Sequence, residues 1–255
     1  MLKTADWNTD LYLKFEKQRT QPAMDLAQRV SGYHASKIAD LGCGPGNSTA
    51  ILKAVFPNAY LIGIDSSENM INKARSAHPD IKFALGAVQN LADTYDLIFS
   101  NACLQWIPNH KKLLPYLMSR LNDRGVLAVQ VPNNEQSPLY KAVRQTAVEF
   151  PHDFSGTYYE QNPLLAPNEY YEILSKCSSS FEIWETIYYH SMPSHEELIN
   201  WIKSTRLRPY SACLDENEQQ AFKANLLSRI KPQYPITSDG QVIFKFKRLF
   251  FIAEK

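Results

Sequence analysis

The segment from Ile38 to Asn47 carries three glycines at alternate positions, preceded by an aspartate. It reads Asp40-Leu41-Gly42-Cys43-Gly44-Pro45-Gly46, between an apolar run and an amphipathic stretch. Glycines at a strand-to-helix turn let the backbone approach a ligand and present amides at a helix N-terminus. Dinucleotide binders use the spacing G-x-G-x-x-G, and Pro45 lacks an amide that a pyrophosphate would need. The turn therefore predicts a site for a ligand other than a dinucleotide; the alternative is a tight turn without a ligand.

A second acidic residue, Asp65, ends the next apolar run, which starts at Leu61. It follows the glycine turn by about twenty residues, where a carboxylate can accept hydrogen bonds from both hydroxyls of a ribose. The alternative is that Asp65 caps the helix after it, although Ser66 or Ser67 could do so instead. We favour the ribose interpretation.

These residues need a parallel sheet to bring them to one edge. From Lys37 to Val131, short apolar runs alternate with amphipathic stretches of helical length, which is the pattern of strands joined by crossover helices. The carboxyl ends of parallel strands meet at one edge, where ligands bind in such folds. The pattern predicts strands at 37–41, 59–65, 81–85, 95–101 and 125–131, and helices at 47–56, 67–77 and 110–121.

The segments on either side of this unit differ in character. Residues 8–30 are predicted to form a short helical pair, interrupted by Pro22, that could act as a lid over a site. After Pro132, dense aromatics and prolines indicate an irregular insertion. Beyond it, the patterns predict helices at 168–176, 194–203 (with a capping box from Ser194) and 215–231, and strands at 181–190 and 241–253.

The predicted fold is α/β: a doubly wound, seven-stranded, mostly parallel sheet with helical cap insertions. We expect one domain over residues 1–255. Within it, 1–36 would form the N-terminal lid and 37–132 the cofactor-binding core, while 133–255 would supply substrate-capping helices and the last two strands. At roughly 100–200 residues per domain, a single large domain of this length is reasonable.

Composition narrows the functional class. The chain has 255 residues, 44% of them hydrophobic, and 27 basic against 26 acidic side chains give a net charge of +1. This balance lacks the basic stripe of a nucleic-acid binder. Neither a transmembrane helix nor a signal peptide fits the pattern. The four cysteines form no C-x-x-C pair, which argues against disulfide or zinc frameworks and favours a reducing cytoplasm.

The glycine turn, Asp65 and the run Tyr95 to Asn101 together resemble the class I S-adenosylmethionine-dependent methyltransferases. The resemblance covers about 37–132 in motif detail and implies S-adenosyl-L-methionine as cofactor. Further matching stretches include Asp6-Trp7-Asn8, Leu104-Gln105-Trp106-Ile107-Pro108, Tyr188 to His195 and Leu207-Arg208-Pro209. They resemble members of the family that esterify a small-molecule polycarboxylate. The alternatives are methylation of a malonyl group on a carrier protein and a non-catalytic nucleotide-binding module.

The resemblance also implies which residues bind the cofactor. In the family an aspartate after the third strand usually binds adenine, but here that position is Ala87, so backbone amides or Gln89 would have to hold the ring. The implied cofactor-binding set is Asp40, Gly42, Cys43, Gly44, Gly46, Asp65, Ser66, Met70, Ala87, Val88 and Asn101.

The proposed chemistry limits the other residues that are needed. A carboxylate is ionised at neutral pH, so it needs no general base, and we predict no catalytic acid, base or covalent nucleophile. Neutral donors suit the attacking carboxylate, while arginines suit spectator carboxylates. Gln105 and Trp106, after the fourth predicted strand, are the candidate neutral donors, and Tyr188 and His190 could line the pocket; core packing is the alternative for Trp106, Tyr188 and His190. The resemblance implies Arg19, Arg208 and Arg248 as further substrate-binding residues, and a solvated surface charge is the alternative for each. No metal is predicted, because the histidines and carboxylates lack ligand spacing.

Overall fold

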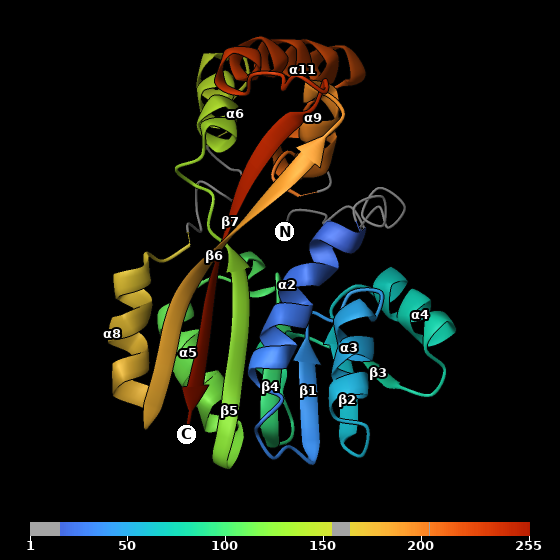
Figure 1. Ribbon diagram of the computed structural model, residues 1–255, viewed down its shortest axis with the longest axis vertical. Coiled ribbons are helices and arrows are strands. Elements are labelled where there is room, and N and C mark those ends of the chain that lie inside the picture. The colour runs from blue at the N-terminus through green and yellow to red at the C-terminus, as the bar shows by residue number, and fades with distance from the viewer. Residues whose placement is uncertain (1–15, 155–163, 204) are drawn as a thin grey trace. The chain divides into compact units, whose positions relative to one another are not determined.

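The computed structural model describes residues 16–154, 164–203 and 205–255, and it contains a seven-stranded sheet (Figure 1). The strand order is β3-β2-β1-β4-β5-β7-β6. The parallel strands are β1 (Lys37–Leu41), β2 (Tyr60–Asp65), β3 (Lys82–Leu85), β4 (Tyr95–Asn101) and β5 (Leu121–Pro132). Figure 1 shows β7 (Val242–Glu254) running opposite to β5 and to β6 (Ser180–Met192). The predicted mostly parallel, doubly wound sheet is confirmed.

The central strands are buried along almost their whole length, as expected when helices cover both faces of a parallel sheet. Alternate residues of β1, such as Ala39 and Leu41, share a core cluster with Leu127 of β5. Helix α5 (His110–Ser119) adds its inner leucines to this cluster. Helix α8 (Pro167–Cys177) adds Tyr170 and Leu174, so residues distant in sequence share one core.

The helices that follow the first two strands begin as the sequence predicts. Helix α3 (Asn47–Val55) starts directly after the glycine turn. Helix α4 (Glu68–Ala77) is capped by Ser67, whose hydroxyl accepts a hydrogen bond from the amide of Met70. Ser67, and neither Asp65 nor Ser66, is therefore the N-cap. Asp65 is left for another role.

Within the described residues the structure differs from the sequence predictions in three regions. Helix α2 (Glu16–Arg29) continues through Pro22, so no break occurs there. The helix predicted at 110–121 ends at Ser119 because β5 begins at Leu121, four residues early, and pairs with Tyr95 before a register shift. The irregular insertion contains a regular helix, α6 (Pro138–Glu149), capped by Ser137.

By its internal contacts the chain divides into two compact units. Among the described residues, the larger unit comprises 16–132, 164–186 and 249–255, and the smaller unit comprises 133–154, 187–203 and 205–248. Among its described residues the smaller unit contains α6, α9 (His195–Lys203), α10 (Arg208–Ser211) and α11 (Glu216–Ile230). No helix in the described ranges has both the length and the apolarity needed to cross a bilayer.

Candidate functional site

The glycine turn after β1 depends on a backbone conformation that L-residues rarely adopt. Gly42, Gly44 and Gly46 have φ of 70°, 54° and 97°. A Cβ at Gly42 would overlap the side chain of Cys103, and one at Gly46 would lie 2.7 Å from the ring of His78. At Gly44 a Cβ would meet nothing within 4 Å. Two glycines therefore pack against protein, while the third leaves open space beside its backbone, as a ligand requires.

Asp40, near the end of β1, binds the helix that follows the glycine turn. It is fully buried, and its Oδ2 accepts hydrogen bonds of 2.7 Å from both Ser48 and Thr49, in the first turn of α3. Its Oδ1 is buried with no hydrogen-bond partner among the described residues. Burial raises the pKa of Asp40 to about 6, although the hydrogen bonds from Thr49 and Ser48 oppose that shift.

Asp65 lies beside the open glycine. Its Oδ2 accepts a 3.0 Å hydrogen bond from the amide of Gly44, and its Oδ1 accepts one of 2.9 Å from the amide of Ser67. The predicted proximity of Asp65 to the glycine turn is thus present in the larger unit. A carboxylate can accept several hydrogen bonds at once, so these two amides leave a role toward a ribose chemically feasible.

The ends of the next strands complete this edge of the sheet. Asn101 ends β4, and its Oδ1 is a buried acceptor with no partner among the described residues. Ala87 precedes a short 3-10 turn, Val88–Asn90, in which Val88 is buried. The unpartnered oxygens of Asp40 and Asn101 are both acceptors, which would complement a ligand that presents donors such as an ammonium group.

Three other predicted cofactor residues have different surroundings. The side chain of Cys43 belongs to a core cluster with Ile71 and Phe83, and its thiol donates a 3.7 Å hydrogen bond to the carbonyl of Gly44. Met70 is buried on α4, with 4% of its surface exposed. Ser66 is exposed beside Asp65.

The 3-10 turn after β4, Leu104–Trp106, carries the two predicted neutral donors. Leu104 is fully buried, whereas Gln105 and Trp106 are half-buried. Leu104 therefore packs in the core, whereas Gln105 and Trp106 keep part of their surface accessible. The Nε2 group of Gln105 donates a 2.7 Å hydrogen bond to the carbonyl of Ala102.

In the smaller unit, His190 and Arg248 lie within a group of aromatic rings that we call the aromatic face: Tyr188, His190, Trp201, Phe244 and Phe246. The Arg248 guanidinium lies 4.7 Å from the centre of the Phe246 ring, and Arg248 is only 3% exposed. The Nε2 atom of His190 is buried with no hydrogen-bond partner in the described chain. Burial, and then the charge of Arg248, lower the pKa of His190 to about 4, so the free imidazole is neutral at neutral pH.

The remaining two arginine candidates are half-buried: Arg19 on α2 in the larger unit, and Arg208 at the start of α10 in the smaller. The sequence analysis did not identify a network of ion pairs in the smaller unit, which is centred on Glu135. Arg206, 3% exposed, binds both carboxylate oxygens of Glu135 at 3.0 and 3.2 Å. Arg144 binds the same carboxylate at 2.8 Å.

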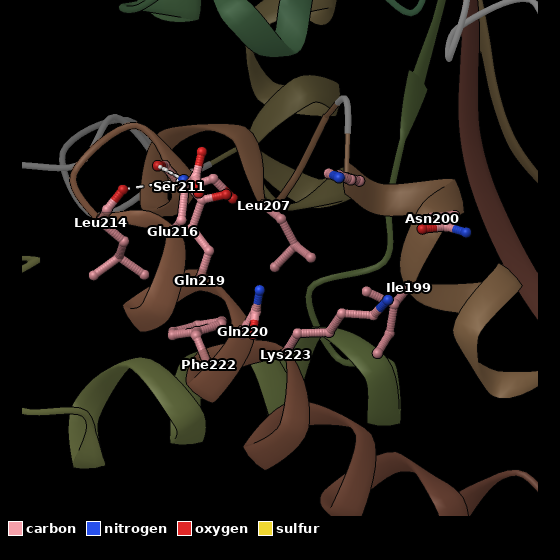
Figure 2. A pocket seen from close by; sticks show the side chains of 11 residues that line it. Ile199, Asn200, Leu207, Ser211, Leu214, Glu216, Gln219, Gln220, Phe222 and Lys223 are labelled. Atoms are coloured by element: carbon pink, nitrogen blue, oxygen red, sulfur yellow. Dashed lines mark hydrogen bonds between the residues drawn. The ribbon is translucent and has the colours of Figure 1, made fainter.

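The smaller unit also has a pocket of about 320 Å³, shown in Figure 2. Ile199 and Asn200 of α9 and Phe222 and Lys223 of α11 contribute to its lining. None of the predicted substrate residues lines it. In the described parts of the chain, no group of three or more His, Cys, Asp or Glu side chains could hold a metal ion.

Comparison with known proteins decides the family. A family model described as a methyltransferase domain matches residues 34–189. Trans-aconitate 2-methyltransferase of Escherichia coli is 44% identical over 253 residues, 98% of this chain and 99% of the relative. The enzyme of the same name from Shigella flexneri matches equally. The chain belongs to the methyltransferase family. The resemblance inferred from the glycine turn and Asp65 is thereby confirmed.

Solved structures agree on the fold of this methyltransferase. The YcgJ protein of Bacillus subtilis has a TM-score of 0.62 at 13% identity and covers 92% of this chain and 98% of its own. A phosphoethanolamine N-methyltransferase of Haemonchus contortus, solved with S-adenosylhomocysteine, has a TM-score of 0.57 at 17% identity. It covers 92% of this chain and 52% of its own. At such identities the likeness concerns the fold alone.

Proposed function

We propose that this methyltransferase transfers a methyl group from S-adenosyl-L-methionine to a carboxylate of trans-aconitate, forming a methyl ester. The observation that carries the proposal is the 44% identity, over 98% of the chain, to enzymes named trans-aconitate 2-methyltransferase. The match extends through both units, so it includes the residues outside the cofactor-binding core as well as the glycine turn.

The edge of the sheet fits the cofactor. Open space beside Gly44 would allow a nucleoside to approach the backbone, and Asp65, which accepts the amide of Gly44, is the proposed partner of the ribose hydroxyls. The buried oxygens of Asp40 and Asn101 are acceptors suited to the ammonium group of the methionine portion. When bound, S-adenosyl-L-methionine supplies a methyl group on a sulfonium, whose S–C bond breaks as the acceptor oxygen attacks. With alanine at position 87, the adenine would be held by backbone amides or by Gln89.

The residues of the chain then have to orient the acceptor. A carboxylate with an ordinary pKa near 4 is fully ionised at pH 7, so no residue has to remove a proton. Catalysis can come from holding one oxygen in line with the methyl group in a dry site, which is worth up to about 7–11 kcal/mol in well-oriented systems. Gln105 and Trp106 are the proposed donors to that carboxylate, because neutral N–H groups position it without strongly reducing its nucleophilicity.

We assign the spectator carboxylates to cationic groups. Arg19, Arg208 and Arg248 are the candidates, with His190 as a neutral group near Arg248 and Tyr188 stacked on His190. Since His190 is neutral in the free protein, it would serve as a hydrogen-bonding group.

The assignment of Asp65 to the ribose is tested by Asp65→Ala. Loss of charge-assisted hydrogen bonds should weaken S-adenosyl-L-methionine binding by roughly 1.5–3 kcal/mol, measured by calorimetry. Asp96→Ala is the matched control, because Asp96 instead accepts hydrogen bonds from the amides of Ser36 and Lys37 at the other end of the sheet. Unchanged affinity in a folded Asp65→Ala variant would remove the ribose assignment.

The function as a whole is tested by incubating the purified protein with S-adenosyl-L-methionine and a panel of acceptors. We expect the methyl ester of trans-aconitate by mass spectrometry. Turnover of a malonyl carrier protein in its place would indicate the carrier-protein reaction. Cofactor binding without turnover of any acceptor would favour a non-catalytic module.

A further inference from the structure

The turn that carries Gln105 and Trp106 lies between two residues with left-handed backbone. In the described chain the non-glycine residues with positive φ are Ala102, Asn109 and Arg124. Ala102 (54°) and Asn109 (61°) bracket the turn. Left-handed backbone costs an L-residue roughly 1–2 kcal/mol, so surrounding contacts must hold it in place.

His110, the first residue of α5, provides such a contact. Its Nε2 lies 2.7 Å from the carbonyl oxygen of Leu104, and its Nδ1 lies 2.6 Å from the hydroxyl oxygen of Tyr170 in α8. A carbonyl can only accept, so Nε2 carries the proton and donates it. In the neutral ring Nδ1 is then an acceptor, and the Tyr170 hydroxyl donates to it.

Because this group is buried, His110 depends on both of its hydrogen-bond partners. His110, Leu104 and Tyr170 are 6%, 0% and 1% exposed, so water is a poor substitute for either partner. The carbonyl of Leu104 also accepts a 2.9 Å hydrogen bond from the amide of Ile107, so it holds both ends of the turn. Burial lowers the pKa of His110, which keeps the imidazole in the neutral form that this pattern requires.

We propose that His110 is a positioning residue for methyl transfer: it fixes the Leu104 carbonyl and thereby sets the positions of Gln105 and Trp106. Tyr170 acts one step further away by selecting the tautomer that donates to Leu104. The link to catalysis rests on the proposed function, in which Gln105 and Trp106 bind the acceptor carboxylate. The anchoring of the turn itself does not depend on the identity of the acceptor.

The test compares His110→Leu, which removes the donor, with His110→Gln, whose amide nitrogen can still donate to Leu104. A displacement near 1 Å can cost about 100-fold, so kcat/KM for trans-aconitate should fall about 10- to 100-fold in His110→Leu and largely recover in His110→Gln. The dissociation constant of S-adenosyl-L-methionine should stay within about twofold, because the change affects acceptor binding only.

Leu174→Ala is the control for general destabilisation. Leu174 is fully buried in the same core cluster as Tyr170, and no side-chain hydrogen bond joins it to the turn. Its thermal stability should fall while kcat/KM stays near that of the unmodified protein. An equal loss of kcat/KM in Leu174→Ala and His110→Leu would overturn the positioning role.

Amide hydrogen exchange separates this proposal from the function. In His110→Leu the amides of Trp106 and Ile107, which donate to Cys103 and Leu104, should exchange faster. Unchanged exchange would overturn the proposal whatever the acceptor. If exchange is faster in His110→Leu but the unmodified protein does not methylate trans-aconitate, His110 still anchors the turn and the proposed function is wrong.

Discussion

The glycine turn of the larger unit and the aromatic face of the smaller unit both hold buried ionisable groups, Asp40 and His190, but the groups that surround them differ. Around the turn, the hydroxyls of Ser48 and Thr49 donate to one carboxylate oxygen of Asp40, and backbone amides donate to Asp65. On the aromatic face, rings surround His190 and Arg248. Burial shifts both pKa values toward the neutral form, but the hydrogen bonds to Asp40 oppose that shift, whereas the charge of Arg248 adds to it at His190.

This difference matches the two tasks that the proposed reaction sets. A cofactor shared by many enzymes can be bound largely by backbone, which depends on glycines at fixed spacing. An acceptor with several carboxylates has to be recognised by side chains whose charges and donors fit it. We therefore expect changes at the turn to act through backbone geometry, and changes on the aromatic face to act through charge.

The largest effect is expected from Gly42→Ala, which would sharpen the backbone side of the comparison. The alanine would have to keep the positive φ of Gly42, and its Cβ would overlap the side chain of Cys103. The free energy of unfolding should therefore fall by about 2–5 kcal/mol. Gly44→Ala meets no atom and should cost only about 1 kcal/mol, yet it should weaken cofactor binding by filling the open space. Thermal melting and calorimetry measure the two effects.

Gly240→Ala supplies the control, since Gly240 also has positive φ (82°) and open space around it but lies in the turn before β7. It should destabilise the protein as much as Gly44→Ala does and leave cofactor affinity unchanged. Equal affinity in the Gly44 and Gly240 variants would mean that the cofactor does not approach Gly44.

A smaller loss is expected from Glu135→Ala, which tests side-chain charge in the smaller unit. Removing this carboxylate takes from the buried Arg206 its bidentate partner, and the unfolding free energy should fall by about 2–3 kcal/mol, since Glu135 is itself partly exposed. Glu182→Ala is the control, because the ion pair of Glu182 with Arg29 is exposed and should contribute little. Chemical denaturation of both variants decides; a similar, small change in each would contradict the importance of the buried pair.

Acidification should change the stability through the two environments in opposite directions. Because the pKa of Asp40 is raised in the folded protein, its contribution to the free energy of unfolding is present at low pH and is lost as the pH rises through about 6. Lowering the pH from 7.5 to 5 should therefore add about 1 kcal/mol of stability through Asp40. Because the pKa of His190 is lowered in the folded protein, its contribution to the free energy of unfolding is present above pH 6.5 and is lost as the pH falls toward 4. Lowering the pH from 7.5 to 5 should therefore remove at most about 2 kcal/mol of stability through His190.

Denaturation curves at both pH values should therefore show a smaller acid loss in His190→Phe than in the unmodified protein, and a larger one in Asp40→Asn. His190→Phe keeps a ring in the aromatic face while removing the titrating group. Identical pH dependence in all three proteins would show that neither residue titrates as its burial requires.

The same comparison explains how much the sequence could reveal. The parallel strands and the glycine turn were predictable because apolar runs, glycine spacing and Asp65 are local signals. Helix α6 was missed because its surroundings are rich in aromatics and prolines, although Ser137-Pro138 is a recognisable helix start. The early start of β5 depends on a register shift against β4, which has no local pattern.

Contacts between side chains far apart in the sequence could not be predicted from the sequence. His110 and Tyr170 are 60 residues apart, and Glu135 and Arg206 are 71 apart. Each pair consists of ordinary polar residues until the fold brings them together. Ser48 and Thr49 were closer to predictable, because hydroxyls in the first turn after the glycines can reach back to Asp40.

The pH dependence of esterification tests the central claim most directly: that an already ionised carboxylate is positioned without a general base. With saturating S-adenosyl-L-methionine and trans-aconitate, kcat for ester formation should stay level between about pH 6 and 9, because the acceptor is ionised well below this range and the arginines stay charged. A kcat that rises tenfold per pH unit across neutrality would show that a proton has to leave before transfer, and it would contradict the ionised-carboxylate mechanism.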